Sequence, residues 1–246
     1  VTNNIGVCIA TSGPGATNLI TGISGCFYDS VPLLVITGQV STFRMSGSTG
    51  VRQIGFQETP IIKICESITK YSVQIKDANN VLYELEKAFV ISQEGRKGPV
   101  LIDIPDNIQR ELIDLDECPR FNPKAENSSN EIGDKANNYL KDILKYVSRS
   151  KRPIIIAGWG VHLAGVETFT TKLVEKMSIP MVTTWGAADM LKNNHRLYIG
   201  TFGTHGQRHA NFAVQNSDLI ISLGARLDTK ATGTPINTFA RDAKKI

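Results

Sequence analysis

The chain has 246 residues, of which 41% are hydrophobic and 20% charged, and its formal net charge is +4. This length favours two domains of about 100 to 130 residues, each large enough to bury a core of its own. The basic residues are spread along the chain, which argues against a nucleic-acid partner. No apolar stretch approaches the roughly 20 residues that span a bilayer, which argues against a membrane segment.

The four cysteines are scattered, with neither a Cys-x-x-Cys pair nor histidines at zinc-binding spacing. This pattern predicts no metal site in the chain and favours a reducing, cytoplasmic setting. The sequence starts at Val1 and stops at Ile246, where AKKI is typical of the entrance to another strand. We therefore expect an excerpt of a longer polypeptide.

The run from Gly6 to Gln39 predicts a strand, a tight turn and a helix, followed by a second strand. Residues 6–10 are apolar without alternation, which predicts a strand buried on both faces. Gly13, Pro14 and Gly15 form the turn, and residues 16–18 open a helix whose first amides face outward.

The second strand of this run covers residues 33–37, and Gln39 follows at its carboxyl end, where open α/β sheets bind ligands. An ordinary strand-turn-helix corner without a ligand explains the same spacing, so both readings stay open.

The remaining elements alternate between strand and helix, which predicts two α/β units with parallel sheets, the second of them Rossmann-like. In the first half, a strand is expected at 71–75, a helix at 79–94 with Leu82, Leu85 and Phe89 on its apolar face, and a buried strand at 100–104. In the second half, helices are expected at 131–147 and 166–177, and strands at 154–157, 181–184 and 219–223. The polar stretch 114–134 is the best linker candidate.

Three glycine-bearing loops follow strands or apolar runs in the second half. They are Gly158-Trp159-Gly160, the segment GTFGTHG at 200–206, and Gly224 to Asp228. A Gly-x-Gly turn lets a diphosphate approach the backbone, although tight packing between strand and helix explains it equally well. Arg226 offers a planar fork for phosphate or a flavin edge, and Asp228 offers a carboxylate for a hydroxyl. Together the loops favour a nucleotide-shaped cofactor.

The first half offers weaker candidates. Phe56 and Gln57 follow a glycine- and serine-rich loop of the kind that is mobile or lines a channel. Lys70 and Arg96 either attract an anion or face solvent. We find no nucleophile elbow, Walker motif or paired carboxylates, so the chain shows no self-sufficient active site.

Seven segments in one order give the chain a specific resemblance. They are TSGPGATN, FYDSVPLLVITGQV, GFQET, ITKY, GRKGPVLIDIPD, GTFGTHG and SDLIISLGARLDTKATG. With these segments the chain resembles the large catalytic subunit of acetolactate synthase and its thiamine-diphosphate-dependent relatives. The resemblance implies the later part of a pyrimidine-binding domain at 1–114, a linker at 115–131, and a C-terminally truncated central domain at 132–246.

The resemblance also implies which residues contact ligands. Pro14, Asn18 and Gln39 would line the thiamine pocket. Phe56 and Gln57 would border the substrate channel, with Lys70 at its mouth. In flavin-containing members the positions that touch FAD match Ser30, Arg96, Gly160, Trp185, Gly186, Phe202, Gly203, Thr204, His205, Gly224, Ala225, Arg226, Leu227 and Asp228.

By the same resemblance, the parent enzyme uses thiamine diphosphate and Mg²⁺ to decarboxylate a 2-oxo acid such as pyruvate and to condense the product with a second carbonyl, as in branched-chain amino acid biosynthesis. The catalytic glutamate is expected before Val1, and the Gly-Asp-Gly motif that holds the diphosphate and Mg²⁺ is expected in a third domain. A homodimer or homotetramer and a regulatory subunit are the implied partners. The chain alone is expected to be inactive.

Two positions depart from the acetolactate synthase pattern. The chain has Asp228-Thr229-Lys230 where Asp-Asp-Arg is usual, and Asp106 where a lysine is usual. A lysine ammonium cannot donate the two parallel hydrogen bonds that a planar arginine guanidinium offers. A related decarboxylase of 2-oxo acids or acyl-CoA, or a carboligase of polysaccharide synthesis, therefore stays open. A non-catalytic nucleotide-binding module is the alternative from another class.

Overall fold

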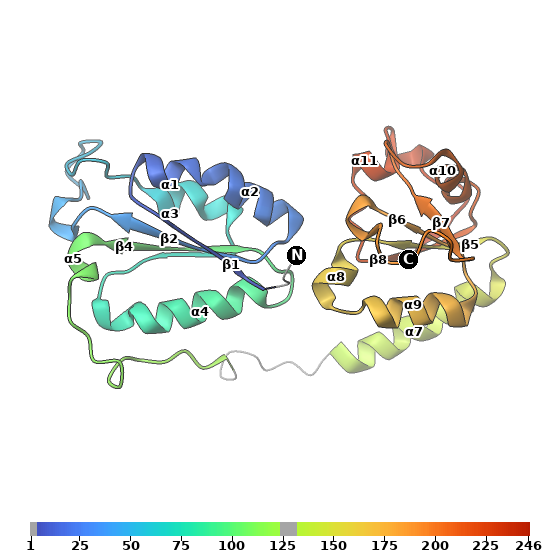
Figure 1. Cartoon of the computed structure of the whole chain (residues 1–246), viewed down its shortest axis with the longest axis horizontal. Coiled ribbons are helices and arrows are strands. Elements are labelled where there is room, and N and C mark those ends of the chain that lie inside the picture. The colour runs from blue at the N-terminus through green and yellow to red at the C-terminus, as the bar shows by residue number, and fades with distance from the viewer. Residues whose placement is uncertain (1–3, 124–131) are drawn as a thin grey trace. The chain divides into compact units, whose positions relative to one another are not determined.

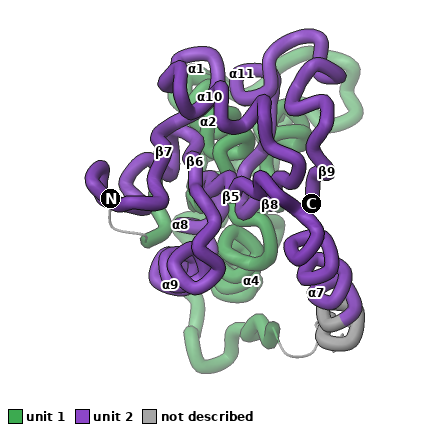
Figure 2. Tube along the Cα trace, turned by 90° about the vertical axis from the view of Figure 1, so that its right-hand side faces the viewer, with its two compact units in different colours: residues 1–128 green, residues 129–246 purple. Residues whose placement is uncertain are grey.

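The computed structural model describes residues 4–123 and 132–246. The chain divides into two compact units, Val1–Ser128 and Ser129–Ile246 (Figures 1 and 2). Each unit is built on its own parallel sheet, which confirms the predicted fold class. The predicted domain boundaries at 114 and 131 stay predictions.

The first unit contains a four-stranded sheet in the order β1-β2-β4-β3. The strands are β1 (Gly6–Ala10), β2 (Leu33–Gln39), β3 (Tyr71–Gln74) and β4 (Pro99–Pro105). The helices are α1 (Pro14–Asn18), α2 (Ile20–Asp29), α3 (Ile61–Cys65), α4 (Val81–Gln93) and α5 (Asp106–Gln109), with short 3-10 turns η1 (Thr42–Arg44), η2 (Glu66–Ile68) and η3 (Ala78–Asn80). Helices α1, α2 and α3 cover one face of the sheet, and α4 covers the other (Figure 1).

Two central strands form the core of this unit because their side chains are apolar on both faces. Val35 and Leu101 pack under α1, α2 and α3. Val100 and Ile102 face α4. These four side chains are fully buried. The predicted strands at 33–37, 71–75 and 100–104 are confirmed, with β2 two residues longer.

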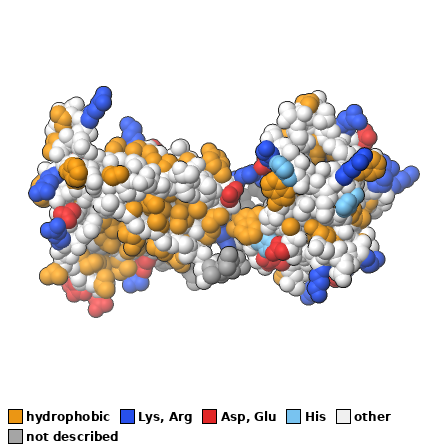
Figure 3. All heavy atoms as spheres, turned by 45° about the horizontal axis from the view of Figure 1, so that its top comes forward, with side chains coloured by type: hydrophobic (Ala, Val, Ile, Leu, Met, Phe, Trp, Pro, Cys, Tyr) orange, Lys and Arg blue, Asp and Glu red, His pale blue; other side chains and the backbone are white. Residues whose placement is uncertain are grey.

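The prediction that the first strand is buried on both faces is wrong. Hydrophobic side chains reach the surface of this unit at many points (Figure 3), and Val7 and Ile9 are 59% and 74% exposed. The strand lies at the edge of the described sheet and pairs with β2 alone, so nothing described covers the face from which these two side chains project. An apolar run does not specify strand order, and strand order decides burial here.

The apolar face predicted for the helix at 79–94 is partly wrong. Phe89 is 45% exposed, whereas Ala88 and Ser92 are fully buried. Leu85 does pack on the core. The helix turns Leu85, Ala88 and Ser92 toward the sheet, a spacing of three and four residues that lets a small residue approach the strands closely.

The predicted linker begins in contact with the first unit. Cys118 is 5% exposed, and the Phe121 amide donates to the Glu86 carboxylate at 2.9 Å. The Phe121 ring meets Tyr83 edge-on with centroids 5.6 Å apart. Residues 124–131 of the predicted linker lie outside the described residues.

The second unit contains a five-stranded parallel sheet in the order β7-β6-β5-β8-β9. The strands are β5 (Pro153–Ala157), β6 (Met181–Thr183), β7 (Tyr198–Thr201), β8 (Leu219–Leu223) and β9 (Lys244–Lys245). The helices are α7 (Ile132–Arg149), α8 (Gly160–Ala164), α9 (Glu167–Met177), α10 (Arg208–Gln215) and α11 (Thr229–Thr232), with 3-10 turns η4 (Trp185–Ala187) and η5 (Ile236–Thr238). Helices α7 and α9 lie on one face and α10 on the other (Figure 1).

The predicted Rossmann-like arrangement is confirmed, including the strand entrance at AKKI, where β9 pairs with β8. Strand β7 and helix α10 were not predicted, because Gly200 interrupts the first and the second is short, with half of its residues polar. In the helix expected at 166–177, the apolar Phe169 is 75% exposed while Thr170 is buried, so the sheet-facing stripe is shifted by one residue. Among the described residues, no helix is long and apolar enough to cross a membrane.

Candidate functional site

The carboxyl edge of the first sheet gathers the residues expected around thiamine. Pro14 begins α1 and Asn18 ends it, directly after β1, and both are exposed. Gln39 ends β2, and because parallel strands end at the same edge, the three positions lie at one edge of the sheet.

A close backbone contact brings the loop of Phe56 and Gln57 to this edge. Gly13 has φ 62°, and a Cβ placed there would lie 2.7 Å from the Gln57 Cβ. Gln57 itself has φ 66°. Phe56 beside it is 86% exposed. The turn after β1 therefore packs on the predicted channel segment, and only glycine fits at position 13.

Gln39 is held at three points and is only 6% exposed. Its amide Nε2 donates to the Thr59 carbonyl at 2.7 Å and to Asp103 Oδ2 at 3.1 Å. Its Oε1 accepts the Val40 amide at 3.0 Å. Asp103 was missed by the sequence analysis, although a single acid inside the apolar strand VLIDI was the signal that could have found it.

Asp103 is fully buried between β2 and β3. It also accepts the Thr37 hydroxyl at 2.7 Å and Gln74 Nε2 at 2.8 Å. Burial raises the pKa of Asp103, and the three hydrogen bonds, which favour the ionised form, offset part of that rise.

Glu58 organises the glycine- and serine-rich loop at 41–57. One carboxylate oxygen accepts the Ser46 amide at 2.6 Å and the Ser46 hydroxyl at 2.7 Å, and the other accepts the Ile54 amide at 2.9 Å. Burial alone would raise the pKa of Glu58, but the hydrogen bonds from Ile54 and Ser46 hold it below its usual value. The loop is thus folded around a carboxylate.

Ser30, Arg96 and Lys70 lie at the opposite, amino edge of the sheet, because they precede β2, β4 and β3 respectively. Arg96 Nε donates to Ser30 Oγ at 2.8 Å, so the structure brings these two predicted FAD positions together.

The Lys70 ammonium caps the last turn of α4, where it donates to the carbonyls of Ile91 and Glu94. Burial lowers the pKa of Lys70, and Glu94 partly opposes this. The unit does not bring Lys70 to Phe56 and Gln57, which lie at the other edge, and its role at a channel mouth stays a prediction.

In the second unit, the Gly158 turn packs directly on the loop after β8. The Gly160 amide donates to the Gly224 carbonyl at 2.9 Å. A Cβ at Gly158 would lie 2.4 Å from the Ala225 Cα, and one at Gly160 would lie 2.7 Å from the Gly224 Cα. Close backbone packing therefore explains these glycines by itself.

Asp228 and Arg226 form an ion pair within the same loop. Arg226 Nη2 donates to Asp228 Oδ2 at 2.9 Å, while Oδ1 caps α11 by accepting the amides of Lys230 and Ala231. Burial alone would raise the pKa of Asp228, but the Arg226 guanidinium and these amides keep it low. Leu227 between them has φ 51° and packs partly on the core.

The loop from Phe202 to His205 joins this corner through its backbone. Phe202 is buried, and the Thr204 amide donates to the Lys230 carbonyl at 2.7 Å. A Cβ at Gly203 would lie 2.8 Å from the same carbonyl. His205 projects outward and lies against Trp185, with ring centroids 5.1 Å apart.

Trp185 is 56% exposed, so the ring pair with His205 faces solvent at the carboxyl edge of β6 and β7. Gly186 follows it, and a Cβ there would lie 3.1 Å from the Cβ of Trp159. The predicted FAD positions of this unit therefore cluster at one edge.

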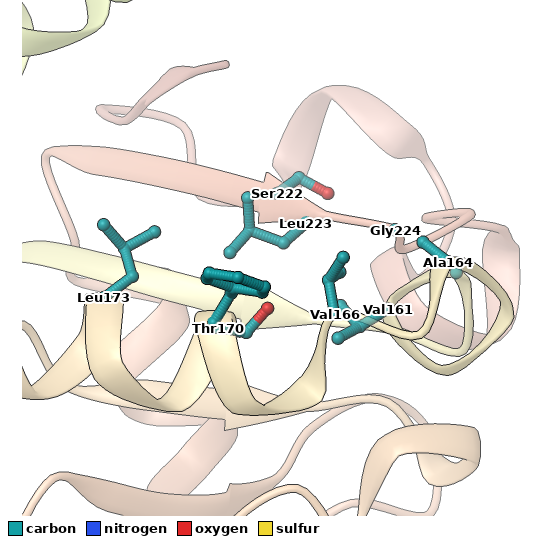
Figure 4. A pocket seen from close by; sticks show the side chains of 10 residues that line it. Val161, Ala164, Val166, Thr170, Leu173, Ser222, Leu223 and Gly224 are labelled. Carbon is teal, nitrogen blue, oxygen red and sulfur yellow. The ribbon is translucent and has the colours of Figure 1, made fainter.

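A hollow of about 540 Å³ lies between α8, α9 and β8 (Figure 4). Its lining is mostly apolar and consists of Gly160, Val161, Ala164, Val166, Phe169, Thr170, Leu173, Ser222, Leu223 and Gly224. Of the predicted FAD positions only Gly160 and Gly224 border it. Within residues 4–123 and 132–246, no group of three or more His, Cys, Asp or Glu side chains could hold a metal ion.

His162 was also missed by the sequence analysis. Its Nδ1 lies 2.9 Å from Glu167 Oε1 and its Nε2 lies 2.9 Å from Asp189 Oδ1. The imidazole also lies against the Trp159 ring, with centroids 5.0 Å apart. This bridge ties α8 to the start of α9 and to the segment after η4, and thereby supports the Gly158 turn.

The close glycine packing predicts that Gly158→Ala destabilises the second unit by about 3 kcal/mol or more, because the added Cβ meets backbone that has no room to move. Gly22→Ala is the control, since nothing lies within 4 Å of a Cβ placed at Gly22 in the first turn of α2 and alanine favours a helix. Denaturant unfolding followed by Trp159 and Trp185 fluorescence measures the effect. Equal midpoints for Gly158→Ala and the wild type would refute it.

The Glu58 contacts predict that Glu58→Gln loosens the loop at 41–57 and lowers stability by about 1 kcal/mol, a value reduced for solvent screening. Because the folded-state pKa of Glu58 is lowered, its contribution is present above the ordinary carboxyl pKa and is lost as pH falls through the folded value. Limited proteolysis and urea unfolding at pH 7 and pH 3 test this, with the exposed Glu66→Gln as control. If the stability difference between Glu58→Gln and the wild type is as large at pH 3 as at pH 7, the charge of Glu58 does not cause it.

Comparison with known proteins agrees with this two-unit arrangement. Residues 1–75 match the family "Thiamine pyrophosphate enzyme, N-terminal TPP binding domain", and residues 140–246 match "Thiamine pyrophosphate enzyme, central domain". The two matched regions fall in different compact units.

Relatives with assigned names match almost the whole chain. A probable acetolactate synthase large subunit of Methanococcus aeolicus is 38% identical over 98% of this chain and 39% of its own length. The acetolactate synthase large subunit of Corynebacterium glutamicum is 38% identical over 100% of this chain and 38% of its own. The chloroplastic acetolactate synthase 2 of Nicotiana tabacum is 37% identical over 98% of this chain and 35% of its own.

The chain thus spans well under half the length of these relatives. Its two sheets, the order of the two family matches and the similarity along its full length agree with one another. The chain belongs to the thiamine pyrophosphate enzymes, of which it contains residues of the N-terminal and central domains.

Proposed function

We propose that the complete protein is a thiamine-diphosphate-dependent carboligase that decarboxylates a 2-oxo acid such as pyruvate and joins the product to a second carbonyl. The similarity along the whole chain to proteins named acetolactate synthase is the observation that carries this proposal. The relatives are more than twice as long as this chain, so the reaction is proposed for the complete polypeptide.

In this proposal the carboxyl edge of the first sheet forms the pyrimidine half of the thiamine site. Pro14 and Asn18 border it from α1, and Gln39 offers a fixed amide. Gln39 Oε1 accepts one hydrogen bond, from Val40, and keeps a second lone pair for a donor on a ligand. The bound cofactor supplies the nucleophilic carbon for attack on the 2-oxo acid, while these residues orient it and exclude water.

The catalytic glutamate and the Gly-Asp-Gly motif for Mg²⁺ belong, in this proposal, to other parts of the complete polypeptide. Glu58 does not replace the glutamate, because its carboxylate is already engaged by Ser46 and Ile54. The chain alone is therefore expected to lack activity.

FAD is proposed as a candidate second cofactor at the carboxyl edge of the second sheet. The exposed ring pair of Trp185 and His205 suits a flat aromatic ligand, and Arg226 lies at the same edge. The fit is partial, since the Gly160 amide and the Arg226 guanidinium already have partners within the protein.

A homodimer or homotetramer, a regulatory subunit and a cytoplasmic location complete the proposal. The assembly and the regulatory subunit follow from the family resemblance and from relatives that are named large subunits, and the location follows from the scattered cysteines. The similarity along the whole chain favours the carboligase over a non-catalytic nucleotide-binding module.

Product analysis on the complete enzyme tests the proposal. Incubation with pyruvate, thiamine diphosphate and Mg²⁺ is expected to yield acetolactate and carbon dioxide, and Gln39→Leu is expected to weaken thiamine diphosphate binding about tenfold through the lost hydrogen bond. Lys63→Met on the exposed side of α3 is the control, with unchanged affinity expected. Acetaldehyde as the main product would identify a decarboxylase. Turnover of pyruvate in the absence of thiamine diphosphate, or binding of a nucleotide with no binding of thiamine diphosphate, would contradict the proposed thiamine-dependent function.

A further inference from the structure

A buried carboxylate lies beneath the proposed thiamine site. Asp103 is fully buried on β4, the strand between β2 and β3. Its partners Thr37, Gln39 and Gln74 all donate hydrogen bonds to it. Throughout the described residues, every buried side-chain nitrogen and oxygen has a partner, so this network is complete. A charge placed so deeply needs such partners to remain in the fold.

Strand register explains how the four side chains meet. Thr37 and Gln74 are the direct neighbours of Asp103 on the two flanking strands. Gln39 lies two residues beyond Thr37 and therefore on the same face of β2. This is the face of Val35 and Leu101, which α1, α2 and α3 cover. The network is thus built into the sheet and does not depend on a loop.

The carboxylate distinguishes the two ends of the Gln39 amide. Asp103 Oδ2 accepts hydrogen bonds from the NH₂ groups of both Gln39 and Gln74, so it binds the NH₂ end of the Gln39 amide. The Thr59 carbonyl, also an acceptor, takes the other proton of that NH₂ group. An inverted amide would place Oε1 against both acceptors and leave the Val40 amide facing a donor. Three unfavourable contacts, in place of three hydrogen bonds, therefore oppose inversion.

We infer that Asp103 is a positioning residue that holds Gln39 so that the amide oxygen, rather than its NH₂ group, is offered to a ligand. The inference rests on the proposed function only for the identity of that ligand, the pyrimidine part of thiamine diphosphate. A ligand must then place a hydrogen-bond donor, and not an acceptor, against Gln39 Oε1. Thr37 and Gln74 hold the carboxylate in place.

The first test uses the 246-residue chain and needs no cofactor. Hydrogen exchange of the Gln39 side-chain NH₂ group, followed by ¹⁵N NMR, is expected to accelerate about tenfold in Asp103→Asn, because an asparagine amide accepts more weakly than a carboxylate and offers Gln39 an oxygen in only one of its two orientations. Thr37→Val is the matched control: it removes a bond of 2.7 Å to the other carboxylate oxygen, Oδ1, and should change Gln39 exchange less than about twofold. Equal exchange in folded Asp103→Asn and wild type would overturn the inference.

A second variant covers the case in which Asp103→Asn fails to fold. Gln39→Glu places a second carboxylate beside Asp103, so its unfolding midpoint should fall well below that of Gln39→Met at pH 7.5 and approach it as pH is lowered. Failure of Gln39→Glu to fold at pH 7.5, where Gln39→Met folds, also supports the inference. Equal midpoints for the two variants at pH 7.5 would overturn it.

The complete enzyme separates this inference from the proposed function. If both hold, Asp103→Asn raises the Kd for thiamine diphosphate about tenfold with little change in kcat at saturation, and adding it to Gln39→Leu has no further effect. If Asp103→Asn accelerates Gln39 exchange but Gln39→Leu leaves the affinity for thiamine diphosphate unchanged, the thiamine role of Gln39 is rejected and the positioning by Asp103 stands. Weakened affinity in Gln39→Leu with unaltered exchange in Asp103→Asn would reject the positioning alone.

Discussion

The buried carboxyl group of Asp103, at the centre of the first sheet, constrains much of what surrounds it. Removing a carboxylate from water is costly unless donors surround it, and Asp103 receives them from both neighbouring strands. Those donors must lie on one face, which agrees with the register of β2, β3 and β4. The same group fixes Gln39 at the carboxyl edge, so the stability of the sheet and the geometry of the proposed cofactor site depend on one arrangement.

The carboxyl edges of the two sheets are organised by different means. In the first unit, carboxylates hold segments through hydrogen bonds, as Glu58 does for its loop. In the second unit, backbone approaches backbone so closely at Gly158, Gly160 and Gly224 that no side chain fits. At the first edge the Gln39 amide is buried and held by hydrogen bonds, whereas the second edge presents an exposed pair of rings. These features suit ligands of different kinds.

Much of the fold could be predicted because parallel strands are continuous apolar runs, and every such run expected in the sequence became a strand. Burial was harder to predict. The exposure of Val7 and Ile9 depends on strand order, and the buried stripes of α4 and α9 depend on helix rotation, neither of which is local information. For the site, motifs singled out Pro14, Asn18 and Gln39, which lie at one edge of the sheet, and their ligand contacts stay predictions. The partners of Asp103 and Glu58 come from distant or irregular segments that no spacing rule connects.

We propose that the carboxyl edge of the first sheet is a preformed half of a thiamine site. A crystal structure of the complete protein with thiamine diphosphate and Mg²⁺ tests it most directly. We expect the pyrimidine ring at the carboxyl end of β2, with one of its donors on Gln39 Oε1 and the Asp103 contacts unchanged. A cofactor bound away from Gln39, or an inverted Gln39 amide in its presence, would refute the proposed thiamine site.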